Sequence, residues 1–130
     1  MANKIRVSLS LVATLLAAMA PAAAHHSVSG QFDRDKRVKL TGVITKVDWI
    51  NPHTYLHLAV EDDSGDVTMW QLESLPTAML RKAGLTSRML MGEGATVTVD
   101  SIQAHDGTEN LAWLLRIDYP DGHHYQLAGE

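Results

Sequence analysis

The sequence contains no cysteine, and this absence removes several classes of protein from consideration. Without cysteine there can be no disulfide framework, no thiolate nucleophile and no zinc–sulfur site. Aromatic residues are also few, with one phenylalanine, three tyrosines and three tryptophans in 130 residues. A small domain without disulfides must be held together by its hydrophobic core, so we expect Trp49, Trp70 and Trp113 to supply it together with the valine, leucine and isoleucine positions.

Recognisable catalytic motifs are absent as well. The sequence has no Gly-x-Ser-x-Gly, no phosphate-binding Walker loop, no dinucleotide-binding fingerprint and no His-Glu-x-x-His. It also lacks a basic stripe with interleaved aromatic residues, and acidic residues outnumber basic ones by 15 to 11. The sequence therefore predicts neither an enzyme nor a nucleic-acid-binding protein.

Residues 1–24 have the three parts of a secretory signal peptide. Lys4 and Arg6 give a basic start, residues 7–19 form an apolar run, and Ala22-Ala23-Ala24 offers small residues for cleavage. The run is too short for a comfortable membrane span, and no second one follows. We expect cleavage after Ala23 or Ala24 and a periplasmic mature protein without a membrane span. Loss of Lys4 and Arg6 lowers the basic count from 11 to 9 and changes the net charge from −4 to −6.

The mature chain is expected to consist of an N-terminal arm, residues 25–36, and one domain, residues 37–130. Alternating apolar residues predict strands over residues 38–49, 54–60, 67–73, 95–102 and 111–119, with a short last strand around 123–127. A helix is expected after the third strand, where Ser74 can cap it, Pro76 suits its first turn and Gly84 can end it. Its buried stripe would consist of Leu75, Met79, Leu80 and Ala83.

This order of elements favours an OB-type five-stranded barrel with a short C-terminal hairpin strand, and a small β-sandwich is the alternative. The first strand is expected to bend at Gly42, where its apolar phase slips. The fifth strand shows the clearest alternation, and we expect all of its odd-numbered apolar residues on one core face. These residues are Leu111, Trp113, Leu115, Ile117 and Tyr119.

The sequence Asn51-Pro52-His53 predicts a stiff corner between the first two strands. Proline fixes its own φ, and the Asn51 side chain can close a turn on the backbone two residues on. In an OB-type barrel this corner and the loop at His105 frame the usual ligand face. Candidates for that face are therefore Trp49, Asn51, Tyr55 and His105. The alternative for His53 is that it only caps the corner with a hydrogen bond.

Several of these motifs together resemble a family of small exported bacterial proteins of unknown function. The resemblance is carried by His25-His26-Ser27 after the signal peptide, Phe32-Asp33, Gly42, Val47, Trp49 and Asn51-Pro52-His53. Further matches are Asp62, Gly65, Trp70, Glu73, Leu80, Gly92, Gly94 and Asp106-Gly107. The likeness extends over the mature chain, implies a periplasmic single domain without enzymatic character, and brings no known activity with it.

Either cleavage site leaves a terminus able to bind a metal. A chain that begins at His25 can chelate with its α-amine and imidazole, whereas one that begins at Ala24 has His26 in third place. The amine, two deprotonated amides and that imidazole then form a square-planar nitrogen set, which suits Cu(II) and Ni(II). His53 adds an imidazole if the arm folds back.

We therefore predict a periplasmic metal-binding module, copper being favoured, with His25, His26 and His53 as ligands. The alternative is a metal-free module that holds a small molecule, a glycan or a protein on its barrel face; the arm would then be solvated. His57 is excluded from the ligand set because four strand residues separate it from His53 by ~13 Å. His123 and His124 point to opposite faces of a strand and cannot chelate together.

Overall fold

The computed structural model describes residues 28–128, which form a mostly β fold with a few short helices. In chain order the elements are α2 (Val28–Gln31), β1 (Phe32–Asp48), β2 (Tyr55–Glu61), β3 (Val67–Glu73), α3 (Thr77–Lys82), α4 (Ser87–Met91), the 3-10 helix η1 (Gly92–Gly94), β4 (Thr96–Ala104), β5 (Leu111–Asp118) and β6 (His124–Gln126). The six predicted strands and the helical region between the third and fourth are confirmed.

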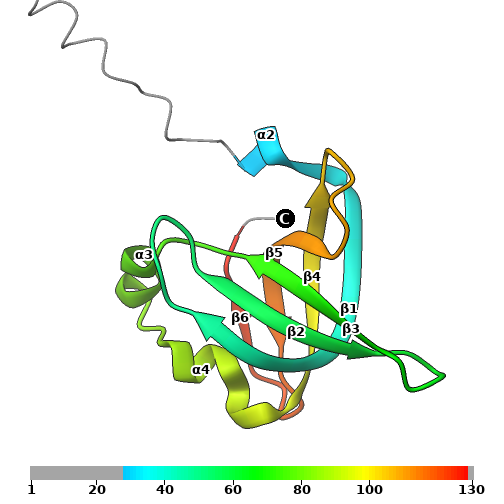
Figure 1. Cartoon of the computed structure of the whole chain (residues 1–130). Helices are drawn as coiled ribbons and strands as arrows, with labels where there is room; N and C mark the ends of the chain where they lie inside the picture. The colour runs from blue at the N-terminus through cyan, green and yellow to red at the C-terminus, as the bar shows by residue number, and fades with distance from the viewer. Residues whose placement is uncertain (1–27, 129–130) are drawn as a thin grey trace, which may run out of the picture.

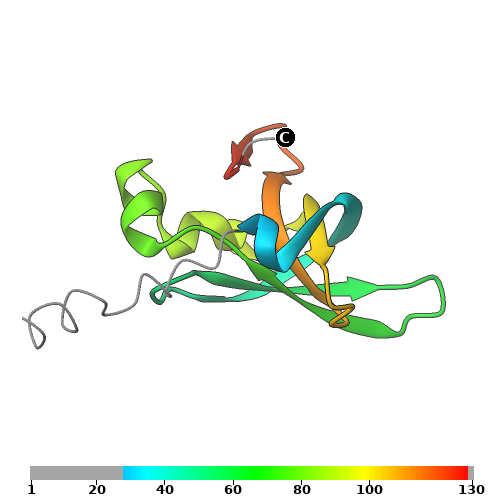
Figure 2. The same cartoon turned by 90° about the horizontal axis from the view of Figure 1, so that it is seen from above.

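The six strands form one sheet in the order β3-β2-β1-β4-β5-β6. Neighbours in this order pair antiparallel, and an additional parallel pairing between β3 and β5 joins five strands into a ring. Figure 1 shows the strongly curved β1 that allows this closure, and Figure 2 shows α3 and α4 on the opposite side from the β2–β3 turn. The closure of the ring brings the ends of β2, β3 and β5 together.

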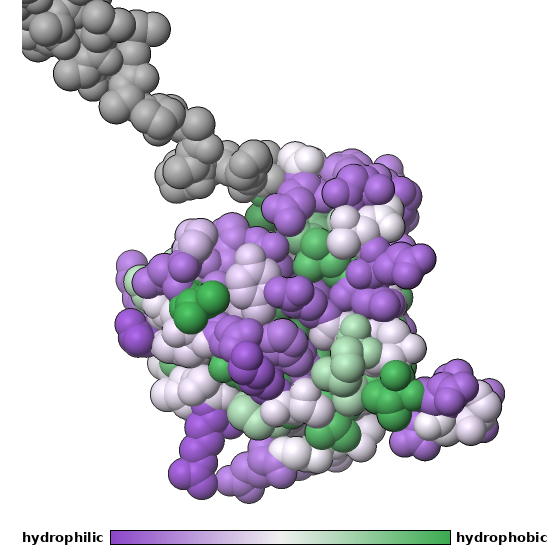
Figure 3. All heavy atoms as spheres, viewed as in Figure 1, coloured by the Kyte–Doolittle hydropathy of each residue, from purple (hydrophilic) through white to green (hydrophobic). Residues whose placement is uncertain are grey.

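The surface carries no broad apolar area on the face shown in Figure 3, where apolar residues form separate spots among hydrophilic ones. The large apolar side chains that remain exposed are Ile50, Val67, Met69, Met79 and Met89. Among residues 28–128, no helix has the length and apolar character needed to cross a membrane.

That interior consists of two clusters. The main core fills the ring with residues from β1, β2, β3, β4, β5 and the helices, among them Ile44, Leu56, Leu72 and Leu80. A second, smaller cluster gathers Phe32, Ile102, Ala104, Trp113 and Leu115, and Val28 of α2 packs against it. Phe32 is 1% exposed, so the start of the described chain is fastened to the domain through this second cluster.

Strand β1 differs from its prediction in two ways. It begins at Phe32, which pairs with Ala104 of β4, rather than at residue 38. Its register against β2 shifts between Ile44 and Lys46, so the core-facing phase changes there and not at Gly42. Gly42 has a different role: a Cβ atom at this position would lie 2.1 Å from the carbonyl oxygen of Ala59, so only glycine permits this close approach.

The helix after β3 is shorter and less buried than predicted. Pro76 occupies the position before α3, and no side chain caps that helix. Ser74 instead continues the strand pairing, because its backbone N–H donates to the Thr54 carbonyl (2.8 Å). Only Thr77 and Leu80 of α3 are buried, whereas Met79 is 55% exposed, so the predicted four-residue stripe is wrong.

Strand β5 is buried on both faces, whereas the alternation in its sequence predicted one core face. Its register against β4 shifts opposite Leu115, and this bulge changes which face the following residues present. Trp113 and Leu115 therefore belong to the second cluster, while Ile117 and Tyr119 belong to the main core. The prediction of a single core face for all five odd-numbered residues is wrong.

Candidate functional site

The corner between β1 and β2 is tied to helix α3. The Asn51–Pro52 peptide bond is cis, and the backbone N–H of Ile50 donates to the Asp48 carbonyl (3.0 Å). The Asn51 side chain is engaged across the chain rather than with its own turn, since its Oδ1 accepts a hydrogen bond from Thr77 Oγ1 (3.0 Å). This hydrogen bond connects the corner to α3, the helix that follows β3.

The strand pairing continues through the residue after His53. Besides the bond from Ser74, the backbone N–H of Thr54 donates to the Leu75 carbonyl (3.2 Å). The β2–β3 ladder is therefore extended one step beyond the pair formed by Tyr55 and Glu73. This extension brings His53 beside the end of β3.

Glu73 is the central group of the site, and the sequence reasoning missed it. Its side chain is only 4% exposed, and its Oε1 pairs with Nδ1 of His53. Tyr55 lies opposite Glu73 in the β2–β3 register, so the two side chains project from the same face. Burial, followed by the charge of the Glu73 carboxylate, raises the pKa of Tyr55, so this hydroxyl stays protonated as a donor.

The register of the β2–β3 hairpin is the signal that would have found this cluster. The turn predicted at residues 62–66 pairs Glu61 with Val67, and counting along the antiparallel ladder places Glu73 opposite Tyr55. Opposite residues in such a ladder project from the same face and contact each other. The burial of Glu73, in contrast, depends on the long-range pairing of β3 with β5.

Trp113 forms the apolar wall of the site. It is the register partner of Glu73 in the parallel β3–β5 pairing, and its ring meets the His53 ring edge-on at 5.6 Å between centroids. It also contacts the ring of Phe32, at 5.9 Å. Because Val28 packs against the second cluster, both α2 and the corner histidine border that cluster.

His105 lies against the first residues of the described chain. Its backbone N–H donates to the Gln31 carbonyl (2.9 Å), and its Nε2 lies 3.2 Å from the carbonyl oxygen of Ser29. Its Nδ1 is 3.8 Å from Oδ2 of Asp33. The β4–β5 loop therefore fastens α2 and the start of β1 to the domain.

The remaining predicted residues lie apart from this cluster. Trp49 packs against the main core, with the Arg81 guanidinium 5.7 Å from its ring centroid. His57 pairs with Asp48 through Nε2 (2.7 Å), so it engages a different carboxylate from the one that holds His53. His25 and His26 lie outside the described residues.

The cluster presents one imidazole nitrogen to the surroundings. Glu73 occupies Nδ1 of His53, and the histidine side chain is 28% exposed, so Nε2 is the atom left to bind a ligand. Within residues 28–128, no three histidine, aspartate or glutamate side chains are grouped to hold a metal ion.

Comparisons with known proteins give a family and no further relative. The sequence model of one family, described as a family of unknown function (DUF6152), matches residues 12–112. No curated protein and no solved structure matches the chain. The match extends over more than half of the chain and confirms the expected resemblance to a family of unknown function. The chain belongs to DUF6152.

Proposed function

We propose that this protein is an exported, periplasmic metal-binding module, with copper as the favoured metal and His25, His26 and His53 as ligands. The observation that carries the proposal is the pairing of His53 Nδ1 with the buried Glu73 carboxylate. Histidines that bind metals characteristically donate their second ring N–H to a carboxylate, which fixes the tautomer and makes the free nitrogen more basic. His53 has this arrangement, and its Nε2 is the free nitrogen.

The charge of the buried carboxylate supports a cation at this position. A carboxylate removed from water is costly unless hydrogen bonds and a positive charge compensate it. His53 pairs with Glu73 through its Nδ1, and Tyr55 lies opposite Glu73 in the strand register. A metal ion on the far side of the His53 ring would add the positive charge, transmitted through the polarised imidazole.

The position of α2 makes the fold-back geometry feasible. Val28 packs against the cluster that contains Trp113, and the Trp113 ring contacts the His53 ring. In the sequence, His26 lies two residues before Val28, and His25 lies three residues before it. At ~3.3–3.6 Å per residue, neither histidine can therefore lie more than roughly 10 Å from Val28. The contacts of His105 with Ser29 and Gln31 hold this segment against the domain.

We expect removal of the signal peptide to place His25 and His26 at the amino terminus, where they can act as ligands. Cleavage after Ala23 or Ala24 frees an α-amine next to one or two imidazoles, and such nitrogen sets favour Cu(II). The role proposed is binding and not catalysis. We also propose that the ring of strands is an OB-type barrel, supported by the closure of β3 on β5 and by the helices between β3 and β4.

The test is copper titration of protein exported and processed in a bacterial host, with intact mass establishing its first residue. We expect His53→Ala to weaken copper binding by at least about tenfold, since losing even a group that orients a ligand costs roughly 10–100-fold. His57→Gln is the matched control, because His57 is another strand histidine paired with a carboxylate. It should bind copper like the parent.

A second arm of the experiment tests the terminus. A cytoplasmic form with additional residues before His25 should lose most of its copper affinity, because the α-amine is then no longer a ligand. If His53→Ala binds copper as tightly as the parent, the fold-back site is wrong. If processed protein binds no copper, the metal-free binding module remains.

A further inference from the structure

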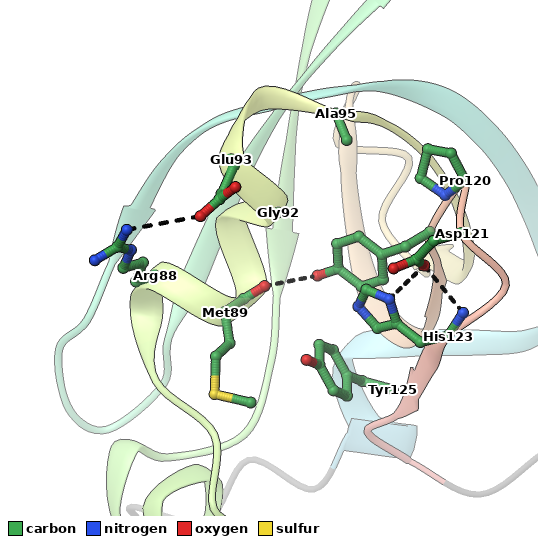
Figure 4. A pocket seen from close by; sticks show the side chains of 10 residues that line it. Arg88, Met89, Gly92, Glu93, Ala95, Pro120, Asp121, His123 and Tyr125 are labelled. Atoms are coloured by element: carbon green, nitrogen blue, oxygen red, sulfur yellow. Dashed lines mark hydrogen bonds and ion pairs between the residues drawn. The ribbon is translucent and has the colours of Figure 1, made fainter.

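A hollow of ≈ 420 Å³ lies at the far end of the fold from His53, between α4 with η1 and the turn that joins β5 to β6. Tyr119, which lines the hollow, follows Trp113 by six residues, or roughly 20 Å along a strand. Trp113 contacts His53, so the two sites are well separated. The volume of the hollow is within the range of about 300–1,000 Å³ typical of small-molecule pockets. Its lining includes Met89, Gly92, Tyr119, Pro120, His123 and Tyr125 (Figure 4).

Three rings form a fixed wall of this hollow. His123 lies flat on Tyr119, with centroids 4.2 Å apart and planes inclined by 8°. Tyr125 meets both rings edge-on, each at 5.4 Å between centroids. Edge-to-face arrangements are favourable for aromatic groups, and all three rings line the hollow.

Hydrogen bonds hold two of these rings in place. The Tyr119 hydroxyl donates to the carbonyls of Leu90 (2.8 Å) and Met89 (3.2 Å), and Gly92 leaves room for the ring because a Cβ there would lie 2.4 Å from it. The Asp121 carboxylate accepts a hydrogen bond from the backbone N–H of His123 (3.1 Å) and also pairs with Nδ1 of the His123 ring. A wall ordered before binding loses little conformational entropy when a ligand arrives.

The ionisable side chains around the hollow are paired with one another. Arg88 lies 3.6 Å from Glu93 on one rim, and Asp121 pairs with His123 on the other. The one positive group on the rim, Arg88, already has a carboxylate partner, so the hollow does not favour an anionic ligand. Among the described residues, neither His123 Nε2 nor the Tyr125 hydroxyl has a hydrogen-bond partner, and Figure 4 shows both side chains extending toward the space opposite Met89.

We propose that this hollow is a second binding site, specific for a neutral, planar molecule of one or two aromatic rings that carries a single OH or NH group. The ring of the ligand packs against His123 and Tyr125, and the Met89 thioether covers it from the opposite side, a favourable sulfur–aromatic contact. The polar group of the ligand bonds to His123 Nε2 or the Tyr125 hydroxyl. The site is independent of the metal proposed at His53.

The test uses indole as the probe, with calorimetric titration and amide chemical-shift mapping of the full mature protein. We expect affinity of about 1 mM or tighter, the range open to a ligand of about nine non-hydrogen atoms, and shifts confined to residues 88–95 and 119–125. Benzoate also has about nine non-hydrogen atoms but carries a single ring and a negative charge, and it should bind more weakly. Tighter binding of benzoate, or shifts centred on other residues, would overturn the proposal.

Variants give an independent check. Tyr125→Ala should weaken indole binding about tenfold or more, and Met89→Ala should weaken it by a smaller factor. Met79→Ala is the matched control, because Met79 is an exposed helical methionine of α3 outside the hollow. Circular dichroism establishes that each variant is folded. Indole affinity unchanged in both Tyr125→Ala and Met89→Ala would refute the site.

Discussion

The Glu73 carboxylate lies almost wholly buried at the end of β3 and pairs with Nδ1 of His53, which enters from the corner before β2. The two residues are 20 positions apart in the sequence, and they meet because the β2–β3 ladder extends past its last strand residues. Trp113 closes the same cluster from β5. A polar pair thus sits at a point where three strands converge and one imidazole edge stays accessible.

Replacement of Glu73 with glutamine tests whether this pairing orients His53. We expect Glu73→Gln to reduce the free energy of unfolding by about 1–3 kcal/mol, since a neutral amide replaces the carboxylate that pairs with His53 in a buried position. Copper affinity should fall roughly 10–100-fold, as for other residues that orient a metal ligand. Chemical denaturation and copper titration measure the two effects.

The control for this variant is Asp48→Asn, which removes the carboxylate that holds His57. Its copper affinity should equal that of the parent. If Glu73→Gln retained full copper affinity while losing stability, Glu73 would have a structural role only.

Trp113 should be the tryptophan whose loss costs most. It is 3% exposed and packs against Phe32 in the second cluster. We expect Trp113→Ala to lower the free energy of unfolding by about 3–5 kcal/mol. Trp70→Ala provides the comparison, because Trp70 is only partly buried at the edge of the main core. Equal losses in urea denaturation would mean that the second cluster contributes less than its burial indicates.

Gly42 should not tolerate a side chain. A Cβ atom there would lie 2.1 Å from the oxygen and 2.9 Å from the carbon of the Ala59 carbonyl, and a paired backbone group cannot move aside easily. Gly42→Ala should therefore destabilise the protein by about 1–3 kcal/mol or more, as overpacking does. Arg37→Ala, at an exposed position of the same strand, should change stability by less than about 0.5 kcal/mol. Thermal unfolding of both variants, with no difference between them, would contradict the close approach.

The acid limb of the stability curve should depend on Asp48. Hydrogen bonds from Lys46 and then His57 lower the pKa of this carboxyl from its ordinary value of 3.8. Because the folded-state pKa lies below the unfolded one, the stabilisation is complete above about pH 4 and is lost as the pH falls through the folded-state pKa. Asp48→Asn should therefore flatten the loss of stability below about pH 4. Denaturation midpoints between neutral and acid pH, with Asp63→Asn as the control, measure this; identical acid limbs for Asp48→Asn and the parent would contradict it.

Local sequence patterns predicted much of the fold. Strict alternation identified β2 and β3, whose apolar faces at Leu56, Leu58 and Leu72 are fully buried. The turn residues at 62–66 determined the hairpin register, which in turn places Tyr55 opposite Glu73. The corner at Asn51-Pro52-His53 was also predicted, because proline and asparagine restrict the backbone through their own covalent structure.

Tertiary structure decided the features that alternation cannot encode. A period of two distinguishes the two faces of a strand but not which face is covered, and bulges in β1 and β5 exchange the faces partway along. Met79 is exposed although its spacing fits a buried helical stripe, because α3 contributes little more than Leu80 to the core. The burial of Glu73 also depends on tertiary structure. The pairing of β3 with β5 joins residues about forty positions apart and brings Trp113 beside Glu73. Alternation along β3 alone would place this carboxylate on the face away from the main core. Propensity and spacing are local quantities, whereas burial depends on which distant strands complete the ring.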